Sequence, residues 1–189
     1  KYILIASLVY GVWTVSFKMG TTWGGYYYMD VIGLTPGEYR SILTIGGLLT
    51  MVGALFGGIL MDKLGRNITL IVGCVGAIIG FVFLGITTIP IFFWMVYLFM
   101  PMILAYIMVY FSEIFPTHIR STCTGITATA ARLSYVLGPL LASTLLIAFP
   151  DMGGFWVIAG LLMIIPIFSL FVKPYETKGK TLEEIQEER

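Results

Sequence analysis

The chain has 189 residues, of which 58% are hydrophobic and 11% are charged, and its formal net charge is +1. Soluble domains carry about 25% charged residues, so a fold in water would leave too much apolar surface uncovered. The composition therefore indicates an integral membrane protein surrounded by lipid, and the nearly neutral charge gives no reason to expect a nucleic-acid partner.

Six stretches of the chain are apolar and long enough to cross a bilayer as helices, which takes about 20 residues. In chain order they cover residues 2–28, 41–61, 68–88, 89–111, 122–149 and 154–172. Lys18 interrupts the first, Pro101 lies near the middle of the fourth, and the fifth contains Arg132. The connections are too short for a soluble domain. The predicted fold class is an all-α membrane protein with six transmembrane helices over residues 1–172, followed by a charged tail over residues 173–189.

Basic residues predict how these helices are oriented in the membrane. If the N-terminus is cytoplasmic, the inner side collects nearly all of them: Lys1, Lys63, Arg66, Arg120, Lys173, Lys178, Lys180 and Arg189. The outer side receives only Arg40. Because positively charged loops stay in the cytoplasm, we expect both termini there, with the protein in the cell or plasma membrane. In the tail, Thr181 and Glu184 form a T-x-x-E capping box, which predicts a short helix on the cytoplasmic surface.

Small and sulfur-containing residues predict how the helices pack. Two GxxxG pairs occur in consecutive helices: Gly53 with Gly57, and Gly76 with Gly80. This spacing lets helix backbones approach closely where lipid gives no hydrophobic drive for association. Cys74 and Cys123 lie in or beside apolar stretches, and we expect buried thiols without a disulfide.

Three motifs stand at the inner ends of the predicted helices: GGILMDKLGRN at 57–67, FSEIFPTHIRSTCTG at 111–125 and KPYETKGKTLEEI at 173–185. The first resembles the G-x-x-x-D-x-x-G-R signature of the major facilitator superfamily. The other two are similar to the E-x-x-P-T-x-x-R junction and the closing P-E-T-K-G segment of its sugar-porter-like branch, although Tyr175 is an extra residue in the last. The resemblance is to the C-terminal half of such a carrier, helices seven to twelve.

The resemblance implies two three-helix units in inverted topology, forming one half of a twelve-helix fold. Its partner would be the N-terminal six-helix half of the same full-length chain, or a second copy of this chain in a homodimer. Because the chain begins at Lys1 and not at a methionine, we expect a fragment of a longer chain.

The first helix departs from the sugar-porter pattern Q-Q-x-x-G-x-N-x-x-x-Y-Y. Aligned by its tyrosine pair at 26–27, the chain has Ser16 and Phe17 in place of the glutamines and Thr22 in place of the asparagine. In the branch that this chain resembles, those amides grip sugar hydroxyl groups. The missing amides therefore argue against a hexose substrate.

Arg132 is a permanent charge deep in an apolar helix. It lies 12 residues beyond Arg120, which we expect at the inner surface, so it is about 18 Å deep in a hydrocarbon layer about 30 Å thick. An arginine at that depth costs at least about 2.5–3.5 kcal/mol. Its helical neighbours are mostly small or polar: Gly125, Ala128, Thr129, Tyr135, Val136 and Pro139. Such a face suits a water-filled cavity, and a guanidinium suits a carboxylate or phosphate; pairing with a buried acid or with carbonyls is the structural alternative.

Lys18 is a second candidate for binding an anion, although its long stem could also carry the charge to a membrane surface. The resemblance supports an anionic solute, because organic anion carriers of the superfamily have an arginine on this eleventh helix and organic cation carriers have an aspartate. The predicted substrate site comprises Arg132, Lys18, Thr22, Tyr26, Tyr27, Thr129 and Tyr135.

Aromatic residues crowd the outer half of the first helix: Trp13, Trp23, Tyr26, Tyr27 and Tyr28. The default interpretation is an interfacial belt. A minority, Tyr26 or Tyr27, could close over the substrate from outside.

Charged residues at the inner ends of the helices are predicted to form a conformational gate: Asp62, Arg66, Glu113, Arg120 and Glu176. In the superfamily such groups form ion-pair networks that hold the inner side shut; a solvated surface is the alternative. His118 lies among them, and a loop histidine is expected to be solvated and not a proton carrier.

The predicted function is secondary active transport of a small organic anion or phosphate by alternating access, coupled to protons. The alternatives are a sugar or polyol porter in which Arg132 is structural, and a membrane receptor that keeps the fold without transporting. No nucleotide-binding loop, metal-ligand cluster or nucleophile–base arrangement is visible. We therefore expect no enzyme activity, no cofactor and no metal.

Overall fold

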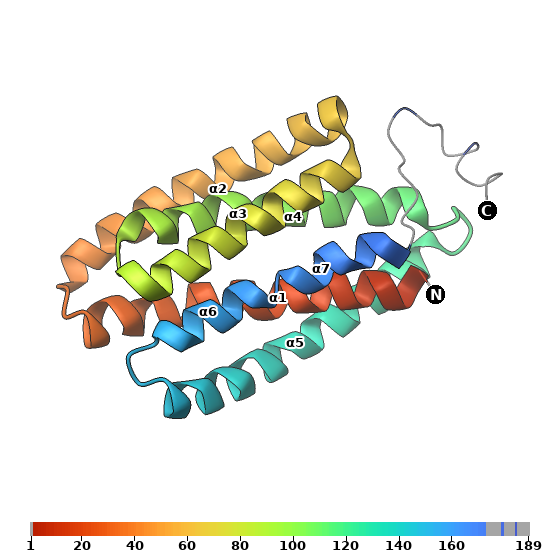
Figure 1. The fold of residues 1–189 in the computed structure, drawn as a ribbon. Helices are drawn as coiled ribbons and strands as arrows, with labels where there is room; N and C mark the ends of the chain where they lie inside the picture. The colour runs from red at the N-terminus through yellow and green to blue at the C-terminus, as the bar shows by residue number, and fades with distance from the viewer. Residues whose placement is uncertain (1, 173–178, 180–183, 185–189) are drawn as a thin grey trace.

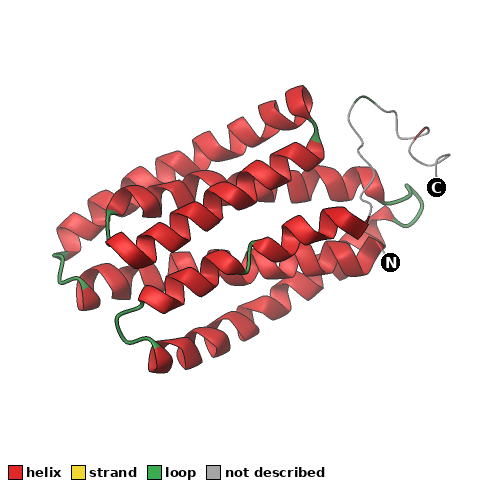
Figure 2. Cartoon of the chain, viewed as in Figure 1, coloured by secondary structure: helices red, strands yellow, loops and turns green. Residues whose placement is uncertain are grey.

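The computed structural model describes residues 2–172 together with Gly179 and Glu184 (Figure 1). The predicted tail helix and Glu176 of the predicted gate lie outside the described residues. The described part consists of helices joined by short loops (Figure 2) and contains no strand.

The helices alternate in direction along one bundle (Figure 1). Their bounds are α1 Tyr2–Tyr26, the π-helix η1 Tyr27–Val31, α2 Pro36–Leu64, α3 Arg66–Thr87, α4 Pro90–Ile114, α5 Arg120–Ala148, α6 Gly153–Leu161, α7 Ile164–Ser169 and the 3₁₀ turn η2 Leu170–Val172. Five of the spans, the first of them α1 with η1, are apolar and long enough to cross a membrane. The last predicted span corresponds to α6 and α7, which follow one another along the bundle (Figure 1) and form a shorter apolar stretch, Gly153–Ser169.

The last predicted span is therefore broken, whereas the sequence predicted one continuous helix over residues 154–172. Pro166 explains the break, because proline has no N–H for the carbonyl four residues earlier, that of Leu162. That carbonyl accepts from Ile165 instead, at 3.2 Å, and Met163 bonds to Gly160 at 2.9 Å. These hydrogen bonds join residues three positions apart and not four, so α6 ends here and α7 begins after them.

The second span begins earlier than the apolar pattern indicates. Its first helical residue is Pro36, and the preceding Thr35 forms a capping box with Glu38. The Thr35 backbone N–H donates to Glu38 Oε2 at 2.8 Å, and the Glu38 N–H donates to Thr35 Oγ1 at 3.4 Å. The T-P-G-E segment lies before the predicted span 41–61 and is a helix start with proline at its first position.

Each of the first three helices packs mainly against later helices in the chain. α1 lies against α5, and α4 lies against α2, while α3 packs on both α4 and α6. Each of the first two pairs has an apolar groove beside it, of about 620 Å³ at α1–α5 and about 350 Å³ at α2–α4. In both pairs a helix of the first three-helix unit packs on a helix of the second, which is the arrangement expected of two units related by a pseudo-twofold axis.

Both GxxxG pairs pack on α4, as close packing requires. A Cβ at Gly53 would overlap the Leu98 carbonyl oxygen, and one at Gly76 would overlap the Phe99 ring. Cys74 and Cys123 are buried and free, which confirms the prediction for the thiols.

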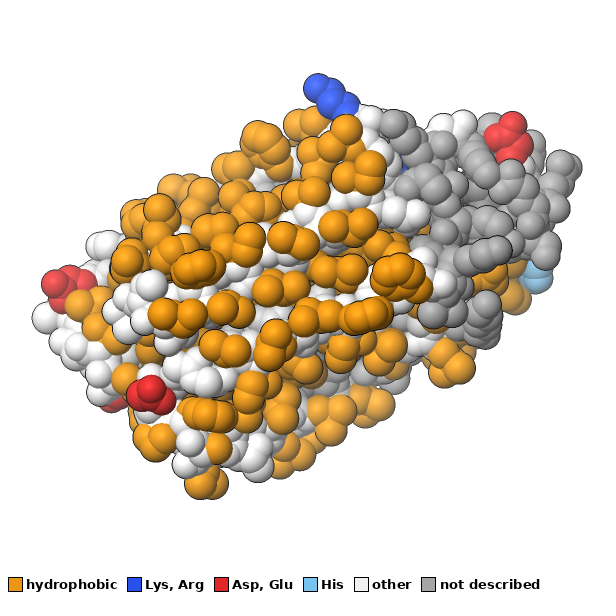
Figure 3. Space-filling view, viewed as in Figure 1, with side chains coloured by type: hydrophobic (Ala, Val, Ile, Leu, Met, Phe, Trp, Pro, Cys, Tyr) orange, Lys and Arg blue, Asp and Glu red, His pale blue; other side chains and the backbone are white. Residues whose placement is uncertain are grey.

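Hydrophobic side chains cover the face of the bundle shown in Figure 3, and charged side chains appear only toward its ends. The predicted aromatic belt is wrong for three residues of the first span, because Trp13, Tyr27 and Tyr28 are buried. The Trp13 Nε1–H donates to the Met100 carbonyl oxygen at 2.9 Å. These rings join helices to each other and do not lie at a lipid interface; Tyr26 is exposed and Trp23 is half-buried.

Candidate functional site

Arg132 lies in the middle of α5. It is 12 residues after Arg120 and 16 residues before Ala148, the first and last residues of that helix, or about 18 Å from its N-terminal end. Its side chain is exposed on the surface of the bundle. No carboxylate of residues 2–172 forms an ion pair with the Arg132 guanidinium.

Lys18 meets the same surface from α1. It is 16 residues after Tyr2 and 13 residues before Val31, the ends of the first span, so it lies close to mid-span. Its Nζ atom lies 5.0 Å from the centroid of the Tyr135 ring. An ammonium over an aromatic face is stabilised by about 0.5–1 kcal/mol at exposed sites and by about 2 kcal/mol when desolvated. The structure therefore puts the Lys18 charge beside α5 and not at a membrane surface.

Tyr135 is a neighbour of both cations. It follows Arg132 by three positions on α5, a spacing that puts two side chains on one face of a helix, and its ring faces Lys18. Tyr10 of α1 is near enough to interact electrostatically with both Tyr135 and Arg132. The Tyr10 ring also contacts Phe111 of α4, with 6.1 Å between centroids.

The remaining predicted residues divide into two groups. Thr22, Tyr26 and Thr129 are exposed, and Thr129 donates its hydroxyl proton to the Gly125 carbonyl oxygen at 2.9 Å. Tyr27 is only 2% exposed and its hydroxyl donates to the Leu84 carbonyl oxygen at 3.2 Å. Tyr27 is thus a core residue, and we remove it from the candidate site.

Ser16 occupies the position of one of the sugar-porter glutamines, and it also points into the core. Its side chain is fully buried and its hydroxyl donates to the Ala159 carbonyl oxygen of α6 at 2.6 Å. It therefore joins α1 to α6 and presents no polar group to the surface that holds Lys18 and Arg132.

The other flank of the α1–α5 pair is apolar. The groove of about 620 Å³ between these helices is lined by residues such as Leu8, Val12 and Leu137, and its lining includes neither Lys18 nor Arg132. α5 therefore has two exposed faces of different chemistry: an apolar face along the groove, and a polar face with Thr129, Arg132 and Tyr135.

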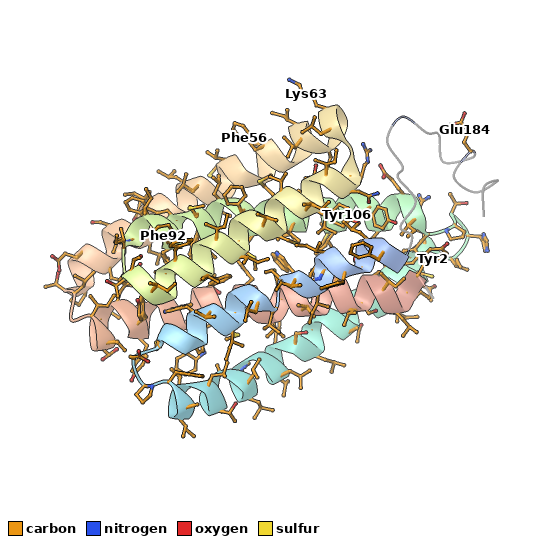
Figure 4. The ribbon with its side chains drawn as sticks, in the orientation of Figure 1. Tyr2, Phe56, Lys63, Phe92, Tyr106 and Glu184 are labelled. Atoms are coloured by element: carbon orange, nitrogen blue, oxygen red, sulfur yellow. The ribbon has the colours of Figure 1, made fainter. Side chains whose placement is uncertain are left out.

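Three of the predicted gate residues come together at the end of the bundle where α1 begins. Arg66 Nη2 lies 2.7 Å from Glu113 Oε1, and Arg66 Nε donates to Glu113 Oε2 at 3.2 Å. This two-point pair is largely buried, since the two side chains are 13% and 17% exposed. Asp62 is a weaker partner, 3.8 Å from Arg66 Nη1 and 80% exposed. Near the same end, Lys63 extends outward from α2 (Figure 4).

Arg120 is not part of this ion-pair cluster. Its Nε donates to the Phe115 carbonyl oxygen at 3.2 Å, and its buried Nη2 atom has no hydrogen-bond partner among the residues that the structure describes. His118, in the adjoining loop, is exposed.

Comparison with known proteins gives one family and several relatives. A model of the Major Facilitator Superfamily matches residues 3–188. Over 75 residues, or 40% of this chain, the sequence is 39% identical to the proton myo-inositol cotransporter hmit-1.1 of Caenorhabditis elegans, of which the match covers 12%.

Solved structures share the fold. A POT family transporter in complex with 5-aminolevulinic acid superposes with a TM-score of 0.78 at 15% identity, over 90% of this chain and 37% of that one. The proton:xylose symporter XylE bound to 6-bromo-6-deoxy-D-glucose gives a TM-score of 0.70 at 23% identity, over 95% of this chain and 42% of that one. The inward-open xylose transporter XylE of E. coli gives a TM-score of 0.73 at 13% identity, over 93% of this chain and 48% of that one. The chain thus spans less than half the length of each of these relatives.

Proposed function

Because the chain belongs to the major facilitator superfamily, we propose that it is the six-helix half of a secondary active transporter that moves a small anion by alternating access. The family and its transporter neighbours indicate a carrier and not an enzyme. In such carriers the substrate is held near the bilayer midplane between two repeats. The polar face of α5 would then turn toward a second six-helix unit, supplied by the rest of a longer chain or by a second copy.

The observation that supports an anion is the pair of cations at mid-span. Arg132 and Lys18 lie near the middle of their helices, and no carboxylate in residues 2–172 pairs with either. A charged side chain at this depth is expensive in lipid, so each cation is expected to face water or a ligand. The guanidinium has five donors in a planar fork that matches a carboxylate or a phosphate.

We propose that protons drive this transport. Two of the similar proteins are named as a proton cotransporter and a proton symporter. Within residues 2–172 the acidic side chains lie toward the ends of the spans, so the transported proton would reside on the substrate or in the second six-helix unit.

The Arg66–Glu113 pair is proposed to hold the cytoplasmic side of the carrier shut. The proposal rests on its short two-point geometry and on its place at the end of the bundle where α1 begins and α7 ends (Figure 1). The basic residues of the inner loops support a cytoplasmic location for this end.

A sugar or polyol is the second candidate substrate. It is favoured by the 39% identity to the inositol cotransporter over 75 residues. Two observations favour the anion over a sugar. The buried Ser16 hydroxyl donates to α6 and is not offered to a substrate, and the two mid-span cations suit a negative charge.

Uptake into vesicles that contain the intact protein tests the choice between the two substrates. We expect radiolabelled succinate or phosphate to accumulate, and accumulation to rise when the outside is made more acidic than the lumen. Labelled myo-inositol and xylose serve as the neutral comparison, and a protonophore should abolish the pH effect. Accumulation of inositol or xylose without accumulation of either anion would contradict the proposal.

A further inference from the structure

Lys18 adds a second positive charge to the site of Arg132, and its contact with the Tyr135 ring fixes where that charge lies. We propose that the site prefers solutes with two separate acidic groups, such as short dicarboxylates, and that the Tyr135 ring positions Lys18 to bind the second group. This inference rests on the proposed anion transport and adds the class of anion and the residue that selects it.

The Tyr135 ring keeps Lys18 in place. Its Nζ lies 5.0 Å from the Tyr135 centroid, and its Cα position is close to mid-span. An ammonium that leaves bulk water loses hydration free energy, and attraction to the negative face of an aromatic ring offsets part of that loss. The ring therefore holds the lysine on the polar face of α5 when no anion is bound, without neutralising its charge.

Both cations are neighbours of Tyr135. Arg132 and Tyr135 lie on one helix face, with Cβ atoms about 5–6 Å apart at this spacing, and the Lys18 Nζ lies over the Tyr135 ring. Tyr135 thus contacts Lys18 and lies one helical turn from Arg132. A monoanion can satisfy Arg132 and leaves Lys18 on the ring, whereas a ligand with two separated carboxylates can bind both cations at once.

No acidic side chain in the described part of the chain competes for either cation. No carboxylate of residues 2–172 forms an ion pair with Lys18 or Arg132, and the acidic residues described there lie toward the ends of the helices. The second acidic group of the solute is therefore the natural counterion of Lys18.

Succinate and butyrate give a matched test, because both have four carbons but carry two and one carboxylates. We expect the intact wild-type protein to bind succinate about tenfold or more tightly than butyrate by titration calorimetry. In Lys18→Gln, succinate affinity should fall about tenfold while butyrate affinity changes less than twofold. Tyr135→Leu should lose the succinate preference in the same way, and Tyr135→Phe, which keeps the ring, should retain it.

The variants also serve as their own folding controls, because retained butyrate binding shows that the site is intact. Equal losses for both acids in Lys18→Gln, or a wild-type preference for succinate in Tyr135→Leu, would overturn this inference and leave anion transport standing. If neither acid binds the wild-type protein and phosphate does not bind either, the proposed function itself fails, and this inference fails with it.

Discussion

Arg132→Gln is expected to lower anion uptake about a hundredfold and to leave the thermal stability of the bundle nearly unchanged. Removing one partner of a buried ion pair costs about 2–5 kcal/mol of binding, and about 1.4 kcal/mol corresponds to a factor of ten. The fold should be spared, because the Arg132 side chain is exposed on the bundle and no described carboxylate depends on it. Initial rates of succinate and phosphate uptake, with melting temperatures of the purified protein, measure both effects.

Arg40→Gln is the matched control, because it removes the same charge from an exposed position in the first turns of α2. Its uptake should stay within about twofold of wild type, as expected of an exposed charge far from the site. Wild-type anion uptake by Arg132→Gln would show that Arg132 does not bind the anion. A collapse in melting temperature that accounts for the loss of uptake would mean that Arg132 is structural.

Glu113→Gln is expected to lower uptake about tenfold or more by weakening the closed cytoplasmic side. The substitution replaces a carboxylate that contacts Arg66 at two points, 2.7 and 3.2 Å, in a place where both side chains are largely buried. Breaking a buried pair costs about 3–5 kcal/mol, and the partial exposure of this one reduces the cost. Uptake rates and labelling of the inner cavity from the cytoplasmic side report the shift in conformation.

Asp62→Asn provides the comparison for this prediction. Its carboxylate is 3.8 Å from Arg66 and 80% exposed, so its loss should change uptake less than about twofold. Exchanging the charges, as Arg66→Glu with Glu113→Arg, should restore part of the activity. Equal effects of Glu113→Gln and Asp62→Asn would instead indicate a solvated surface with no gating role.

Much of the fold could be predicted because membrane helices are specified by local composition. Apolar length identified five of the spans, and Arg120, the start of α5 in the structure, was enough to predict the position of Arg132 along that helix. Local signals for two further features are also present in the sequence. Pro166 removes a backbone donor and divides the last span, and the Thr35 capping box starts α2 before the predicted span 41–61.

The contacts that define the candidate site could not be predicted in the same way. Lys18 and Tyr135 are far apart in sequence, and only the packing of α1 on α5 brings them together. The same limit explains the aromatic residues of the first span. Trp13 and Tyr27 are residue types that are common in an interfacial belt, yet they donate hydrogen bonds to carbonyl oxygens of α4 and α3. A single sequence does not show which side of a helix faces protein and which faces lipid.

We propose that the polar face of α5 borders water in which an anion binds, and cysteine labelling tests this directly. The protein's own cysteines in this chain are buried, so they give a low background. Thr129→Cys probes the polar face, one turn from Arg132, and Leu137→Cys probes the apolar groove on the other flank. We predict that a charged, water-soluble thiol reagent labels Thr129→Cys and not Leu137→Cys, and that saturating succinate or phosphate slows the labelling several-fold. Labelling of Leu137→Cys as fast as Thr129→Cys, or no labelling at Thr129→Cys, would contradict the account.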